Sequence, residues 1–100
     1  MITATFNNVI IAEANDEDTI RIEGGTYFPP DSIKKELFTK TDHSTTCHWK
    51  GEASYYDVLV DGETAHNVAW TYEEPMDGSI DKVGKDFTSY VSFYPQITIS

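Results

Sequence analysis

The residues best suited to chemistry lie in the middle of the chain, where Cys47, His48 and Lys50 fall within four positions. A cysteine thiolate is a nucleophile, and it forms most readily beside a cation or at a helix N-terminus. If this segment is extended, adjacent side chains point to opposite faces, and His48 would not activate Cys47. Two interpretations stay open: Cys47 is the nucleophile of a small enzyme, or it is a buried and inert cysteine.

Lys50 is the second candidate, since it is one of only seven basic residues and comes just before Gly51 and an apolar segment. A lysine in such a place can bind a carboxylate or phosphate, or act with a lowered pKa when it is buried. The alternative is a surface ammonium, or a salt bridge from Lys50 to Glu52 or Glu74.

A metal site is not expected, although His43, Cys47 and His48 are ligands that zinc accepts and His66 could be a fourth. Structural zinc sites use paired short spacings such as Cys-x₂-Cys, and this sequence has none. Residues 77–88 begin like an EF-hand loop, but the glycine at its sixth position and the glutamate at its twelfth are missing. There is also no Gly-rich phosphate-binding loop. We therefore predict no metal and no cofactor.

Six tyrosines and two tryptophans supply aromatic surfaces with polar tips. Such side chains suit a small-molecule pocket, and they equally suit the edge of a core. As a group with Lys50, they predict a ligand site in which Lys50 pairs with an anionic group, Trp70 stacks, and Thr46 and the tyrosines form hydrogen bonds. The predicted site residues are Tyr27, Thr46, Cys47, Lys50, Tyr55, Trp70 and Tyr72.

Apolar and polar residues alternate with period two over most of the chain, which predicts strands. Hairpin turns are expected at Asn7-Asn8, Gly24-Gly25 and Asp61-Gly62. The expected strands are 2–6, 9–12, 19–23, 26–28, 53–60, 64–72, 90–94 and 97–100. The polar region 39–51 is interpreted as a loop with a short strand.

One short helix is expected at about 30–38, because Ile33 and Leu37 are four residues apart and Pro30 can open a helix. One further helical turn is expected within 80–87, weakened by Gly84. The predicted fold is a single domain over 1–100, α+β but mainly β: a small, strongly twisted antiparallel sheet folded on itself.

Composition excludes several classes of protein. Seventeen acidic and seven basic residues give a net charge of −10, so a nucleic-acid binder is ruled out and an anionic membrane surface is disfavoured. The single cysteine cannot form an internal disulfide, and no apolar run approaches the ~20 residues of a membrane span. No signal peptide is recognisable, and a cytoplasmic location is the simplest expectation.

Four segments together resemble a known family: Tyr-Phe-Pro-Pro-Asp at 27–31, Thr-Thr-Cys-His-Trp-Lys-Gly-Glu-Ala-Ser-Tyr-Tyr at 45–56, Ala-Trp-Thr-Tyr-Glu-Glu-Pro at 69–75 and Tyr-Val-Ser-Phe-Tyr at 90–94. They closely resemble the domain of unknown function 427 family over about residues 6–94. The resemblance implies a small, mostly bacterial, β-rich single domain of no established activity, sometimes labelled nucleotidyltransferase-like. The chain departs from the family pattern at His48, usually proline, and at Ser89 and Ser92, usually glycine and alanine.

These observations favour a cytoplasmic domain that binds a small polar or anionic ligand at the predicted site. A small enzyme using Cys47 as nucleophile, or a nucleotidyltransferase-like activity, is the first alternative, so the sequence leaves enzymatic activity undecided. A protein–protein interaction module or homodimer, pairing through an exposed strand edge, is the second.

Overall fold

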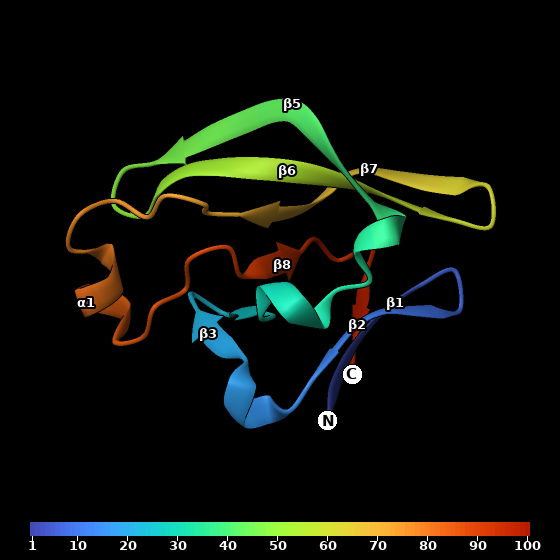
Figure 1. Ribbon diagram of the computed structural model, residues 1–100, viewed down its shortest axis with the longest axis horizontal. Coiled ribbons are helices and arrows are strands. Elements are labelled where there is room, and N and C mark those ends of the chain that lie inside the picture. Colours follow the sequence, from blue (N-terminus) through green and yellow to red (C-terminus); the bar gives the residue numbers. More distant parts are fainter.

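The computed structural model describes residues 1–100 as nine strands in three antiparallel sheets, with one α-helix and three 3₁₀ turns (Figure 1). The four-stranded sheet has the order β5-β6-β7-β8, the three-stranded sheet β2-β1-β9, and β3 pairs with β4. The strands are β1 (Ile2–Phe6), β2 (Val9–Ala14), β3 (Ile20–Ile22), β4 (Gly25–Tyr27), β5 (Phe38–Cys47), β6 (Gly51–Val60), β7 (Glu63–Thr71), β8 (Val91–Phe93) and β9 (Thr98–Ile99). The predicted fold class, mainly β with antiparallel sheets and one short helix, is confirmed. None of the helices has the length and apolar character that a bilayer span requires.

Three hairpins end in two-residue turns with positive φ at both central positions. The turns Asn7-Asn8 and Asp61-Gly62 are as predicted, with φ of 51° and 65° and of 50° and 81°. The third turn is Glu23-Gly24, with φ of 51° and 82°, one residue before the predicted Gly24-Gly25. Gly25 instead pairs with Ile22 in the β3–β4 ladder. This register puts a glutamate at the tip of the hairpin.

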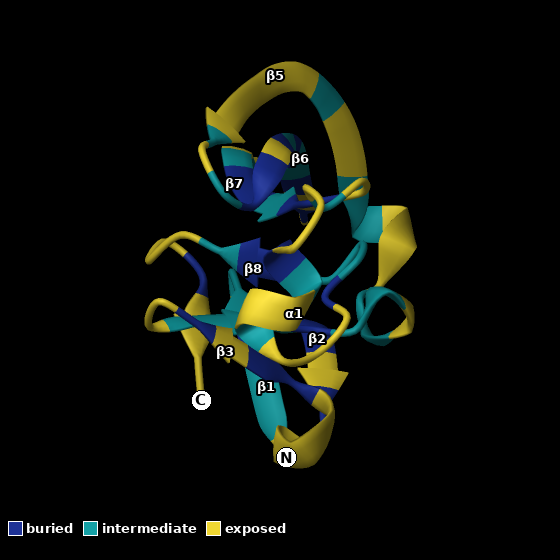
Figure 2. Ribbon diagram, turned by 90° about the vertical axis from the view of Figure 1, so that its left-hand side faces the viewer, coloured by how far each residue is buried: buried dark blue, intermediate teal, exposed yellow.

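The prediction of a loop with only a short strand over 39–51 was wrong, since β5 runs for ten residues along β6. β5 is an edge strand, and Figure 2 shows it exposed along most of its length. An edge strand that buries little surface can be polar on both faces. The sequence of β5 therefore lacks the apolar–polar alternation that predicts a strand.

The prediction of a helix at 30–38 was also wrong in its position. This region holds two 3₁₀ turns, η2 (Pro30–Ser32) and η3 (Lys35–Leu37), separated by extended backbone at Ile33. Ile33 forms a β-bridge with Ala12, and the Lys34 N–H donates to the Ile11 carbonyl at 2.8 Å. A two-turn helix is marginal alone, and pairing with β2 outweighs it. The α-helix, α1 (Ser79–Val83), lies where the weaker helical turn was expected, between left-handed Gly78 and Gly84.

The side chains form two hydrophobic cores. The first contains Phe28, Val58 and Val91, and the second contains Tyr27, Tyr55 and Phe87. The register of β6 against β7 shifts between Tyr56 and Val58, which changes the phase of the buried positions along β6. Tyr55 therefore faces the second core while Val58 faces the first.

Candidate functional site

The second core brings together six of the seven predicted site residues. Tyr27, Tyr55 and Tyr72 are buried in it, and Cys47 and Trp70 pack against it half-buried. Lys50 lies beside these rings, close to Tyr72. We call this group, with two further residues that contact Lys50, the Lys50 cluster: Glu23, Tyr27, Cys47, Trp49, Lys50, Tyr55, Trp70 and Tyr72.

The position of Lys50 is set by the hairpin turn between β5 and β6. The Lys50 carbonyl accepts a hydrogen bond from the Met76 N–H at 2.9 Å, so the segment after β7 crosses directly over the turn. Gly51 adopts φ of 110°, and a Cβ there would lie 3.2 Å from the Met76 nitrogen and 3.3 Å from the Glu74 carbonyl oxygen. Only glycine fits this crossing without strain, which explains why Gly51 follows the lysine.

The Lys50 ammonium is nearly buried, with a side chain only 9% exposed, and its ion-pair partner is the Glu23 carboxylate. Its Nζ also lies 5.1 Å from the Trp49 ring centroid and 5.6 Å from that of Tyr72. Burial alone would lower the pKa of Lys50, but the hydrogen bond to Glu23 and the negative groups nearby raise it overall. Lys50 is therefore held as a cation, and a role as a neutral amine nucleophile does not fit.

The partner differs from both carboxylates considered above, Glu52 and Glu74. Glu23 lies at the tip of the β3–β4 hairpin with its side chain 59% exposed. The hydrogen bond from Lys50, aided by its positive charge, lowers the pKa of Glu23. The sequence signal that could have found Glu23 is its place before Gly24, because Glu-Gly can form the same two-residue turn as Asp-Gly.

Hydrogen bonds join the aromatic residues of the cluster. The Trp70 indole N–H donates to the Tyr27 hydroxyl at 3.1 Å, with the two rings edge-to-face. The Tyr55 hydroxyl lies 2.9 Å from the Thr45 hydroxyl and 3.5 Å from that of Tyr94. Burial raises the pKa of Tyr27, so this phenol stays neutral.

Tyr94 leads from the cluster to the surface. Its ring centroid is 4.7 Å from that of Trp70, and 40% of the residue is exposed. Tyr94, Trp49, Thr45 and Glu23 were not among the predicted site residues. The contacts of Glu23 with Lys50 and of Tyr94 with Trp70 join segments distant in sequence, which alternation along a single strand does not reveal.

Thr46 is the predicted site residue that lies apart from the cluster. It is exposed, and neighbouring side chains on a strand point to opposite faces. Its neighbour Thr45 makes the contact with Tyr55. Cys47 is a free, half-buried thiol that packs against the second core.

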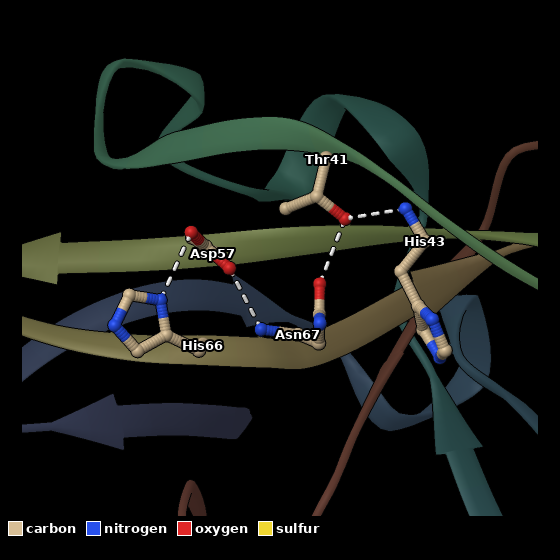
Figure 3. A network of polar contacts seen from close by, with 5 residues as sticks. All are labelled: Thr41, His43, Asp57, His66 and Asn67. Carbon is tan, nitrogen blue, oxygen red and sulfur yellow. Dashed lines mark hydrogen bonds and ion pairs between the residues drawn. The ribbon is translucent and has the colours of Figure 1, made fainter.

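His66, one of the histidines considered as metal ligands, lies outside the Lys50 cluster. His43, by contrast, packs against Tyr55 with ring centroids 4.5 Å apart, and His48 lies in the turn beside Lys50. In Figure 3, His66 contacts Asp57 at 3.2 Å, and Asp57 accepts the Asn67 N–H at 2.7 Å. Asn67 has a positive φ of 48° at the irregular stretch of β7, so Asp57 supports a bulge in the sheet. No group of three or more His, Cys, Asp or Glu side chains is placed to hold a metal ion.

The principal hollows of the surface lie outside the Lys50 cluster. The largest is an open groove of about 890 Å³ beside η1 (Asp16–Asp18), lined by five carboxylates. A second, of about 470 Å³, lies beside η2 and η3 and is lined by two lysines. The side chains of the cluster pack against one another, so a ligand there would bind at its exposed edge.

The fold and the cluster define a small antiparallel β domain in which a nearly buried lysine, beside aromatic rings, is paired with an exposed glutamate. The chain belongs to the family described as Domain of unknown function (DUF427), whose model, named NTP_transf_9, matches residues 1–99. Among curated proteins, none matches the sequence.

Proposed function

We propose that this domain binds a small anionic ligand at the exposed edge of the Lys50 cluster, where the ligand replaces the Glu23 carboxylate. The observation that carries the proposal is a nearly buried ammonium whose counterion comes from an exposed turn residue. A buried charge needs a partner, since burying an isolated ion is costly. That requirement is met here by a carboxylate that can move into solvent.

The surroundings of the Glu23 carboxylate resemble an anion site. Hydrogen bonds from Lys50 and Trp49 both lower the pKa of Glu23, and His48 contributes in the same direction. Lys82 adds a further cation, with its Nζ 4.6 Å from the Trp49 ring centroid. These groups would serve a ligand carboxylate or phosphate equally well.

The body of the ligand would lie against the aromatic edge of the cluster. Trp70 and Tyr94 offer contact surface there, since their ring centroids lie 4.7 Å apart and 40% of Tyr94 is exposed. Rings with polar tips combine stacking with orientation, which suits a small polar molecule. Binding of such a ligand requires no catalytic step, and Cys47 would only line the site.

Intrinsic fluorescence tests this proposal, because both tryptophans of the chain belong to the cluster. We expect inorganic phosphate, titrated at low ionic strength, to change the tryptophan fluorescence of both the wild type and Glu23→Gln. The variant should bind phosphate about tenfold more tightly than the wild type, a difference of about 1.4 kcal/mol in binding free energy. Removing the competing carboxylate frees the Lys50 ammonium.

The matched control is Glu13→Gln, which removes the same charge from an exposed position on β2. Equal gains in both variants would show a general charge effect and contradict the proposal, as would the absence of any fluorescence change.

A further inference from the structure

A second hollow, separate from the Lys50 cluster, lies between the 3₁₀ turns, the start of β5 and the four-stranded sheet. Its volume of about 470 Å³ falls within the range of about 300–1,000 Å³ typical of small-molecule sites. We call it the Lys35–Lys40 pocket, lined by Pro30, Ile33, Lys35, Phe38, Lys40, Tyr56, Ser89 and Val91.

The charge of this pocket is opposite to that of the protein. The chain has seventeen acidic and seven basic residues, yet two of the basic residues line the pocket and no acidic residue does. Lys35 makes no ion pair. The Lys40 ammonium pairs with the Glu73 carboxylate at 2.5 Å, and Glu73 is not one of the lining residues. A cationic hollow on an acidic surface selects a compact anion, because more extended anions would meet repulsion around it.

Two hydroxyls in the lining have no hydrogen-bond partner within the protein, those of Tyr56 and Ser89. Ser89 has a positive φ of 62° and is held by its N–H, which donates to the Tyr72 carbonyl at 2.9 Å. Burial raises the pKa of Tyr56, so its phenol stays a neutral donor. Both hydroxyls are therefore available to an acceptor on a ligand.

The remaining lining is apolar and aromatic. Phe38 and Tyr56 meet edge-to-face, with centroids 5.9 Å apart and planes at 86°. Ile33 is half-buried, and Val91 is fully buried. An aromatic ring entering this space can extend the edge-to-face arrangement and remove apolar surface from water.

We propose that the Lys35–Lys40 pocket binds a small aromatic carboxylate. The carboxylate lies between the ammonium groups of Lys35 and Lys40 and accepts hydrogen bonds from Tyr56 and Ser89. The aromatic ring packs against Phe38, Ile33 and Val91. Glu73 competes for Lys40, so its carboxylate weakens the site. This site goes beyond the function proposed for the Lys50 cluster and uses none of its residues.

The test is a titration of isotope-labelled protein with 3-phenylpropanoate, followed by amide chemical shifts, with neutral 3-phenylpropanamide as the ligand control. We expect shifts concentrated at Ile33, Phe38, Tyr56 and Val91, and at least tenfold weaker binding of the amide. Shifts concentrated at the Lys50 cluster, shifts scattered over the surface, or equal binding of both compounds would overturn the proposal.

Lysine variants test the assigned charges, and both lysines are exposed enough to be replaced without loss of folding. Lys35→Met and Lys40→Met should each weaken 3-phenylpropanoate binding about tenfold. Lys34→Met is the matched control, since Lys34 is exposed, adjacent in sequence and outside the lining. A loss in Lys34→Met as large as in Lys35→Met would contradict the proposal.

Glu73→Gln supplies a test in the opposite direction, with a gain of about threefold expected because Lys40 is released. Glu13→Gln again controls for net charge and should leave the affinity nearly unchanged. An affinity that falls in Glu73→Gln, or rises equally in both variants, would contradict the assigned role of Lys40.

Discussion

At the scale of the residue, the Lys50–Glu23 pair is asymmetric in its burial. The Lys50 side chain is 9% exposed and that of Glu23 59% exposed. Losing the two partners therefore has different consequences. Without Glu23, a nearly buried ammonium loses its counterion, whereas without Lys50 a carboxylate is left mostly in water.

This asymmetry predicts that Glu23→Gln destabilises the fold more than Lys50→Met does. Leaving a buried charge without a partner costs about 1–3 kcal/mol or more. Water can reach the Lys50 ammonium from the exposed side where Glu23 lies, so we expect Glu23→Gln to lose about 1 kcal/mol. Methionine fills the space of the lysine stem between Trp49 and Tyr72, so Lys50→Met is expected to be nearly neutral. Urea denaturation of both variants gives the comparison, and the reverse order of stability would refute the asymmetry.

At the scale of the element, the hairpins were the most predictable feature, and the contacts between hairpins the least. Asn7-Asn8 and Asp61-Gly62 form their turns from local chemistry, and the strands around them follow. The 3₁₀ turns of 30–38 depend on β2, a partner distant in sequence. The β5 strand forms a hairpin with β6, but it lies exposed at the sheet edge and has no alternating pattern of its own.

The candidate site shows the same limit. Tyr27, Cys47, Lys50, Tyr55, Trp70 and Tyr72 were selected from residue type, strand alternation and family resemblance, and the fold brings them together. Glu23 and Tyr94 join them from β3–β4 and from the end of β8, through packing that no spacing encodes. Thr46 was selected in place of Thr45 because alternation does not say which face of a strand is inward.

The turn that presents Lys50 depends on Gly51, and this gives a second prediction. Gly51→Ala combines a left-handed φ with contacts of 3.2 and 3.3 Å to backbone atoms of Met76 and Glu74, so we expect a loss of about 2–4 kcal/mol. Gly62→Ala is the control, since φ is also positive but no atom lies within 4 Å of its Cβ. It should lose only about 1–2 kcal/mol in thermal or urea unfolding. Equal losses would show that the crossing over Gly51 exerts no steric constraint.

At the scale of the whole molecule, neutral phenols distributed over both cores link folding to alkaline pH. Burial raises the pKa of Tyr27, Tyr56 and Tyr72, and hydrogen bonding to Tyr55 together with burial raises that of Tyr94 to about 12. In the unfolded chain a tyrosine titrates near about 10. Above that pH the folded state holds more protons than the unfolded state, so the free energy of unfolding falls as pH rises. The raised pKa of Lys50 acts with the same sign.

We therefore expect stability to be lost progressively between about pH 10 and pH 12. Self-repulsion of a chain with net charge −10 would also destabilise the fold at high pH, and salt separates the two causes. At about 1 M salt the Debye length is only about 3 Å, so repulsion between exposed charges is screened while the protonation of buried phenols is not. Urea denaturation at several pH values should show the loss at both low and high salt. Stability that salt restores fully would assign the effect to net charge and contradict the role given to the four phenols.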